Sequence, residues 1–174
     1  MRALTNPTWI PIFALAGTLL PGMLVPGAAA SAQEPVVAVD DPELLFTDPD
    51  PRLHANKQVV MHVLRELIQC NWWEMADQWM SERYIQHHPA VQSGRDNIVA
   101  FFADGERAET CDKLTIPLVT VLTSDDIVGV VFRMEYDHPD KPGETYTTIW
   151  YDQWRVVDGK VDEHWDISQL TASP

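Results

Sequence analysis

The last third of the chain constrains the fold most, because it has the pattern of a continuous strand meander. Residues 114–123, 127–136, 146–157 and 161–167 are rich in β-branched and aromatic side chains and are separated by short polar turns. Asp158-Gly159, between the last two segments, is a strong hairpin signal. Strands with such short connections pair antiparallel, so we expect a four-stranded antiparallel meander.

Helical periodicity is confined to the preceding part of the chain. One apolar stripe at helical spacing comprises Val59, Val60, Val63, Leu64, Leu67 and Ile68. A second, short helix is expected over residues 72–80, and a third follows Asp96, which we expect to cap it. Between them, residues 84–89 form a short extended segment that ends at Pro89. Helices segregated from an antiparallel sheet predict an α+β domain with three N-terminal helices.

Residues 1–32 have the features of a secretory signal peptide. Arg2 gives a basic start, residues 9–25 are largely apolar, and the small residues 28–32 offer a cleavage site after Ala32. The alternative is a membrane anchor, but three prolines interrupt the roughly 20 apolar residues that a span needs. We therefore expect a secreted or periplasmic protein that is free of the membrane after cleavage. Residues 33–53 hold four prolines and no periodicity, which predicts a flexible linker before a domain at 54–174.

Charge and cysteine content narrow the classes of partner. The chain carries 12 basic and 26 acidic residues, for a net charge of −14, which disfavours nucleic acid and anionic membranes as partners. Cys70 and Cys111 are the only cysteines, and the sequence leaves open whether they pair. Neither cysteine has the neighbours of a zinc motif.

Two segments are too polar for a plain core. They are Gln86-His87-His88-Pro89 and the final hairpin from Asp152 to Asp166. The runs YIQHHP, SGRDNIVAFF and DQWRVVDGKVDEHWDISQ resemble the SnoaL-like polyketide cyclases of the nuclear transport factor two-like superfamily. The resemblance covers about residues 56–169, with His88 in place of the family's usual Asn and Trp154 in place of its usual Phe.

This resemblance implies a cone-shaped α+β barrel, with helices packed on a strongly curved antiparallel sheet around an internal pocket. It also implies a homodimer through the outer sheet face and no cofactor. It does not imply one reaction, because the superfamily includes aldol cyclases, isomerases, dehydratases, hydrolases and binding modules.

The family match assigns roles to the polar side chains. Asp166 matches the acid/base of the cyclases. Asp152 matches an Asp that stabilises an enolate oxygen in ketosteroid isomerase. His164 or His87 would assist, and His88 aligns with the isomerase's general base. Carboxyl groups in an apolar pocket hold protons more firmly and can transfer them near neutral pH. The remaining substrate-binding residues would be Tyr84, Trp72, Trp79, Phe102, Phe132, Trp150, Trp154 and Gln169.

Several alternatives stay open at this point. Hydrophobicity alone would turn Val161, Trp165 and Ile167 inward instead of His164 and Asp166, and a bulge would reverse the faces. His164 could also be a structural partner of a neighbouring carboxylate. The histidines and aspartates have the chemistry of metal ligands, but their spacing resembles no known site, so we predict no metal. The leading hypothesis is a cofactor-independent lyase or isomerase that acts on a small apolar carbonyl compound. The alternative is a non-catalytic module that binds a small hydrophobic molecule.

Overall fold

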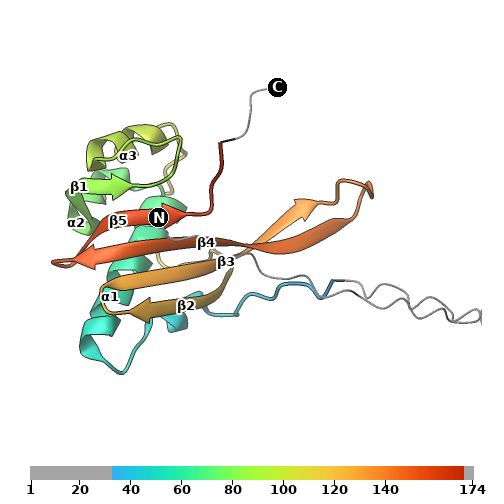
Figure 1. Ribbon diagram of the computed structural model, residues 1–174, viewed down its shortest axis with the longest axis horizontal. Coiled ribbons are helices and arrows are strands. Elements are labelled where there is room, and N and C mark those ends of the chain that lie inside the picture. Colours follow the sequence, from blue (N-terminus) through green and yellow to red (C-terminus); the bar gives the residue numbers. More distant parts are fainter. Residues whose placement is uncertain (1–32, 171–174) are drawn as a thin grey trace, which may run out of the picture. The chain divides into compact units, whose positions relative to one another are not determined.

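The computed structural model describes residues 33–170. The predicted signal peptide lies outside the described residues. Within them, the helices precede the strand meander, as the sequence predicts (Figure 1). None of the helices in this part of the chain has the length and apolar character needed to cross a bilayer.

The longest helix begins at α1 (Pro51–His62) and continues as the π-helical segment η2 (Val63–Gln69). The Asp50 side chain caps its start by accepting from the backbone N–H groups of Arg52 and Leu53, and Pro51 suits the first turn. The stripe predicted from the sequence supplies its buried face, except for Ile68, which is 42% exposed. Val60, Leu64 and Leu67 are almost completely buried.

Three short helical segments and one strand complete the first half of the domain. The 3₁₀ turn η3 (Trp73–Met75) and α2 (Ala76–Trp79) lead directly into β1 (Met80–Gln86). Helix α3 (Arg95–Phe102) starts after Gly94, whose φ of 101° suits glycine. Asp96 therefore lies in the first turn rather than at the predicted cap position, where it still interacts favourably with the helix dipole.

One sheet contains all five strands, in the order β1-β5-β4-β3-β2. The meander strands β2 (Leu118–Ser124), β3 (Ile127–Asp137), β4 (Thr145–Val157) and β5 (Lys160–Asp166) pair antiparallel as predicted. Strand β1 pairs with β5 in parallel, so the sheet is mixed, and the expectation of a wholly antiparallel sheet was wrong. The long connection through α3 and the whole meander is what allows this parallel pairing. The strong curvature implied by the resemblance stays a prediction.

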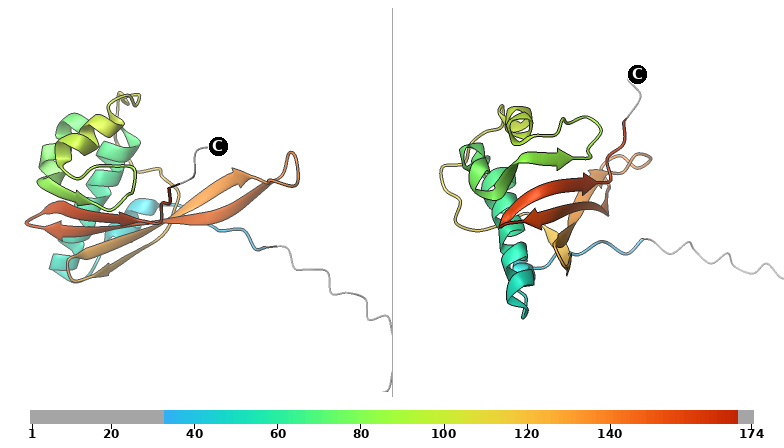
Figure 2. Two further views of the ribbon diagram at one scale, coloured as in Figure 1. Left: turned by 45° about the horizontal axis from the view of Figure 1, so that its top comes forward. Right: turned by 60° about the vertical axis from the view of Figure 1, so that its left-hand side comes forward.

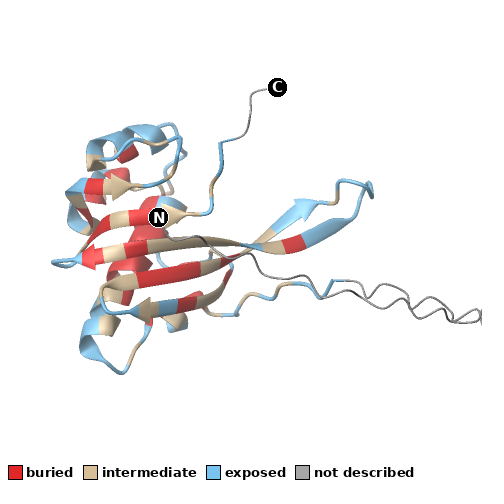
Figure 3. Cartoon of the chain, in the orientation of Figure 1, coloured by how far each residue is buried: buried red, intermediate tan, exposed pale blue. Residues whose placement is uncertain are grey.

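The helices cover one face of the sheet (Figure 2). Buried residues gather where α1 crosses the strands, whereas the far ends of β3 and β4 are largely exposed (Figure 3). On the covered face Val128 and Val130 are fully buried and Trp154 is 3% exposed. We call this the inner face and the opposite one the outer face.

Strand β5 contains a bulge that settles its orientation. Arg155 pairs with Glu163, but the next residue, Val156, pairs with Val161, so Asp162 is an extra residue on β5. As a result, both Val161 and His164 face inward. The hairpin turn is formed as predicted, with positive φ angles at Asp158 and Gly159.

The segment predicted to be a flexible linker is part of the domain. The Val39 backbone N–H donates to the Leu118 carbonyl at 2.8 Å, and the 3₁₀ turn η1 (Pro42–Phe46) follows. Phe46 has no exposed surface and belongs to the core. The apolar run Leu44-Leu45-Phe46 was the signal that the linker prediction overlooked.

Cys70 and Cys111 form a disulfide, with Cα atoms 5.9 Å apart. It ties the end of η2 to the loop before β2. This observation decides between the two states that the sequence left open.

Candidate functional site

A cavity of about 180 Å³ lies between the helices and the inner face of the sheet. Its walls come from η2, η3, β1, α3, β4 and β5. The lining is mostly apolar and aromatic, and it comprises Val63, Ile68, Trp73, Met80, Tyr84, Gln86, His88, Val91, Ile98, Phe101, Phe102, Trp150, Asp152, Trp154, His164 and Asp166. Small-molecule sites typically combine such walls with a few convergent polar groups.

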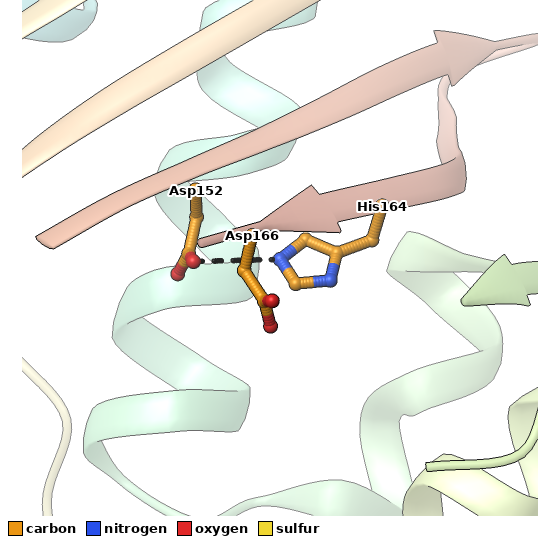
Figure 4. A group of neighbouring side chains, drawn as sticks. All are labelled: Asp152, His164 and Asp166. Carbon is orange, nitrogen blue, oxygen red and sulfur yellow. Dashed lines mark ion pairs between the residues drawn. The ribbon is translucent and has the colours of Figure 1, made fainter. Parts of the chain in front are cut away.

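The polar groups converge on Asp152, His164 and Asp166 (Figure 4). One ligand-type atom from each of the three lies within 4.8 Å of the others. The sheet register causes this convergence. Asp152 on β4 stands directly opposite Asp166 on β5, and His164 precedes Asp166 by two residues on the same face.

Asp152 is held by an indole. The Trp150 Nε1–H donates to Asp152 Oδ1 at 2.6 Å, and His164 Nε2 lies 3.7 Å from the same oxygen. The Asp152 side chain is 18% exposed, so it remains reachable from the cavity.

Asp166 is the more buried of the two carboxylates, with 5% of its side chain exposed. Its Oδ1 accepts from the backbone N–H of Ser168 at 2.9 Å. Its Oδ2 lies 3.9 Å from His88 Nε2, beyond hydrogen-bond distance. One oxygen of Asp166 is thus anchored, while the other is left for a ligand.

The two histidines of the cavity share one partner, Gln86. Its Oε1 lies 2.7 Å from His164 Nδ1 and accepts from the His88 backbone N–H at 3.1 Å. The His88 ring is fixed in turn, because its Nδ1 accepts from the Ala90 backbone N–H at 3.1 Å. A neutral His88 therefore carries its proton on Nε2, toward Asp166.

Tyr84 places a phenol beside these groups. Its oxygen accepts from the Trp154 Nε1–H at 3.1 Å. Burial raises the pKa of Tyr84 far above its ordinary value, and the nearby Asp152 and Asp166 raise it further against the opposing effect of Trp154. The hydroxyl is therefore neutral at all physiological pH values and is available as a hydrogen-bond donor.

No lysine or arginine lines the cavity anywhere in residues 33–170. The two carboxylates of Asp152 and Asp166 therefore have no lysine or arginine partner among the described lining residues.

The comparison with known families is decisive for classification. The model of the SnoaL-like domain matches residues 60–164, more than half of the chain. The chain belongs to the SnoaL-like domain family. The resemblance read from the motifs is therefore confirmed. No curated protein matches the sequence.

Solved structures with a similar arrangement include a candidate polyketide cyclase from Acidithiobacillus ferrooxidans. That protein is 13% identical, with a TM-score of 0.49 over 70% of this chain and 90% of its own. A candidate SnoaL-like polyketide cyclase from Jannaschia sp. CCS1 is 19% identical, with a TM-score of 0.48 over 70% of this chain and 91% of its own. IdmH of Streptomyces antibioticus, a candidate polyketide cyclase, is 13% identical, with a TM-score of 0.45 over 64% of this chain and 90% of its own.

The SnoaL-like cavity brings together most of the residues singled out from the sequence. Those that line it are Asp152, His164, Asp166, His88, Tyr84, Phe102, Trp150 and Trp154. The family match therefore placed the inner face of β5 better than hydrophobicity alone, because the bulge allows Val161 and His164 to face inward together.

His87 is not part of the cavity. Its side chain lies on the outer face, where Nε2 is 2.9 Å from Glu163 Oε1 and the ring stacks on Trp165 at 5.3 Å. Neighbouring residues of an extended segment point in opposite directions, so His87 and His88 cannot both face inward.

Four other predicted wall residues also lie elsewhere. Trp72 donates to the Ala108 carbonyl, and Trp79 stacks on His62 and donates to Glu66. Phe132 is packed in the core, and Gln169 is exposed beyond the end of β5. The Trp79 indole finds its acceptor on η2 and the Trp72 indole finds its acceptor in the loop after α3, which explains why both turn away from the cavity.

Eight lining residues were missed from the sequence, namely Val63, Ile68, Trp73, Met80, Gln86, Val91, Ile98 and Phe101. Alternation along β1 could have found Gln86, since it places Tyr84, Gln86 and His88 on one face. Trp73 stacks on Phe102 with ring centroids 4.6 Å apart. No periodicity in the short helices signalled which of the tryptophans would face inward.

Asp152, His164 and Asp166 are also the residues that could hold a divalent cation, because they offer two carboxylates and one imidazole. The absence of a metal stays a prediction for this site.

Proposed function

We propose that this SnoaL-like domain is a cofactor-independent lyase or isomerase with aldol-type acid/base chemistry. The substrate would be a small, largely apolar carbonyl compound held in the cavity. One observation carries the proposal: Asp152, His164 and Asp166 meet at the polar end of an otherwise apolar hollow with no basic side chain of Lys or Arg among its described lining residues.

The roles follow from which atoms are free. Asp166 Oδ2 has no hydrogen bond among the described residues and would take a proton from the carbon next to the substrate carbonyl. The electron pair of that C–H bond moves into an enolate. Asp152 in its protonated form and the neutral Tyr84 hydroxyl would donate hydrogen bonds to the enolate oxygen. Return of the proton to another carbon completes an isomerisation, whereas attack of the enolate carbon on a second carbonyl forms an aldol.

Export and dimerisation are further parts of the proposal. The Cys70–Cys111 disulfide suits an oxidising compartment, which supports a secreted or periplasmic location. Exposed apolar side chains on the outer face, such as Leu122 (56% exposed) and Ile149 (46% exposed), support a homodimer through that face.

The test needs no knowledge of the physiological substrate. Purified protein in D₂O is mixed with cyclohexanone, and deuterium exchange next to the carbonyl is followed by proton NMR. We expect the wild-type protein to accelerate exchange and Asp166→Asn to lower the rate by about 10²-fold or more.

Asp158→Asn is the matched control, since it removes the same charge from the same hairpin and asparagine accepts the positive φ at this position. We expect it to leave exchange unchanged. If Asp166→Asn also leaves exchange unchanged, Asp166 is not the acid/base. If the wild-type protein binds the ketone without exchanging it, the domain is the binding module considered as the alternative.

A further inference from the structure

The side chain of Gln86 has a defined orientation. Its Oε1 accepts from the His88 backbone N–H at 3.1 Å. A backbone N–H can only donate, so the atom that faces it must be the amide oxygen and not the amide nitrogen.

The same oxygen lies 2.7 Å from His164 Nδ1. An amide oxygen only accepts, so Nδ1 must carry a proton. A neutral imidazole has one proton, and Nε2 is then a bare lone pair. Register maintains this contact, because Gln86 on β1 is the parallel-strand partner of His164 on β5. We infer that Gln86 is a positioning residue that holds His164 as the Nδ1–H tautomer and directs an unprotonated Nε2 at the cavity, which makes the site selective for substrates that present a hydroxyl proton.

The selectivity follows from what Nε2 faces. Asp152 Oδ1 lies 3.7 Å away, and it already accepts from the Trp150 indole. The unprotonated Nε2 therefore lacks a donor among the described residues and stays unsatisfied in a mostly buried site unless a ligand supplies one. The His88 Nε2–H faces Asp166 Oδ2, 3.9 Å away, and therefore does not donate to His164 Nε2. A hydroxyl or enol of the substrate supplies the missing proton.

The substrate class rests on the proposed function, whereas the tautomer assignment does not. Among carbonyl compounds, β-hydroxy ketones carry the required hydroxyl. Two residues of the site can make the proton transfers that cleavage of such a compound requires. His164 Nε2 takes the hydroxyl proton and a new C=O forms. The bond between the α and β carbons then breaks, and its electron pair becomes an enolate, whose carbon takes a proton from Asp166.

The tautomer is tested directly by long-range ¹H–¹⁵N correlation NMR on protein labelled in its histidine rings. We expect His164 to show the Nδ1–H pattern in the wild-type protein. Gln86→Leu should lose it, and Gln86→Glu should keep it, because a carboxylate also accepts from Nδ1. Gln92→Leu, in an exposed loop nearby, is the matched control. An Nε2–H pattern in the wild-type protein, or an unchanged pattern in a folded Gln86→Leu protein, overturns the assignment.

The substrate class is tested with 4-hydroxy-4-methylpentan-2-one and its methyl ether, which differ only in the hydroxyl proton. Quenching of tryptophan fluorescence reports binding, and proton NMR reports the acetone released by cleavage. We expect the alcohol to bind at least tenfold more tightly than the ether in the wild-type protein, and equally in Gln86→Leu. We also expect Gln86→Glu to shift the pH profile of cleavage upward, since its carboxylate favours a protonated His164. A purely structural role for Gln86 would not move this profile.

The outcomes distinguish the proposed function from the inference about Gln86. No cleavage and no cyclohexanone exchange, with the Nδ1–H pattern and the preference for alcohol intact, rejects the proposed function and keeps the inference about Gln86. Equal binding of alcohol and ether rejects the substrate class. Stoichiometric binding of Zn²⁺ that shifts His164 Nε2 also rejects it, because the acceptors would then serve a metal ion.

Discussion

Acidic side chains and histidines meet on both faces of the β4–β5 hairpin, but only on the outer face do they contact an arginine. On the outer face, Glu163 contacts His87 at 2.9 Å and Arg155 at 3.1 Å, and Arg155 also contacts Asp126 at 2.6 Å. On the inner face, His164 and two carboxylates meet with no arginine or lysine among the described lining residues. The outer cluster is a set of ion pairs with arginine, whereas the inner cluster has hydrogen-bond partners but no lysine or arginine among the described lining residues.

The difference shows in the behaviour of the acids. Hydrogen bonds from His87 and Arg155 lower the pKa of Glu163 against the opposing effect of burial, so its charge is stabilised by the fold. The inner acids have their anchored oxygens bound by Trp150 and Ser168 and their other oxygens open to the cavity. Unpaired groups in a hollow cost stability and are characteristic of sites that bind something. Similar residue types one position apart thus form ion pairs on one side of the hairpin and line a cavity on the other.

The largest effect should come from removing one histidine from each face. We expect His164→Ala to lower cyclohexanone exchange by about 10²-fold, because an inner proton carrier is lost. His87→Ala should stay within about twofold, the scatter expected for a surface residue away from the reacting atoms. Exchange rates measured side by side decide this, and a larger loss in His87→Ala would contradict the separation of the faces.

A smaller effect is expected from the neighbouring aromatic residues. Trp150→Phe removes the indole donor from Asp152 Oδ1 and should lower exchange up to about tenfold, the value of one hydrogen bond. Tyr151→Phe, on the outer face, loses only a hydrogen bond to Gln153 and should keep its rate. Equal losses in both variants would show that the indole contact has no special role.

The outer face should matter for association instead. We expect Ile149→Asp to weaken the proposed homodimer at least tenfold, since it places a charge in an apolar interface. Sedimentation analysis across a concentration series measures this. Val37→Asp, an equally apolar exposed position outside the sheet (77% exposed), is the control. A wild-type protein that is monomeric at all concentrations would remove this part of the proposal.

The smallest effect concerns pH and the outer ion pairs. Because the folded-state pKa of Glu163 lies below its ordinary value of 4.5, its ionised form adds stability above that pH and loses the contribution as pH falls through the folded value. Glu163→Gln should therefore be less stable than the wild-type protein at pH 7, by less than about 1 kcal/mol, and the difference should shrink as the pH falls below 4.5. Urea unfolding at pH 7, 5 and 3 checks the sign. A difference that grows on acidification would contradict it.

Local patterns predicted the fold well because most of its elements are defined by neighbours in sequence. The meander, its Asp158-Gly159 turn and the long helix all follow from periodicity and turn chemistry. The parallel pairing of β1 with β5 joins residues about 80 positions apart and left no local signal. The buried position of Phe46 was missed because the prolines around it dominated the interpretation.

The site was predicted unevenly for the same reason. Asp152, His164 and Asp166 lie on a hairpin whose alternation could be read, although only the family match chose the face. The tryptophans at 72, 73 and 79 lie on short irregular helices, where periodicity does not say which ring turns inward. His87 and His88 could have been separated by alternation alone, and the polar character of the whole segment concealed this.

The extra residue at Asp162 has a consequence for how this hairpin tolerates change in length. Side chains alternate between the two faces of a strand. Each inserted or deleted residue therefore moves all the following side chains to the opposite face, unless a bulge accommodates the change. Asp162 shows that this strand already absorbs one, held in place by its contacts with Arg83. Insertions at the exposed Asp158-Gly159 tip could loop out harmlessly, but a further insertion between Asp162 and His164 would move the ionisable groups to the solvent side and the ion-paired ones into the hollow.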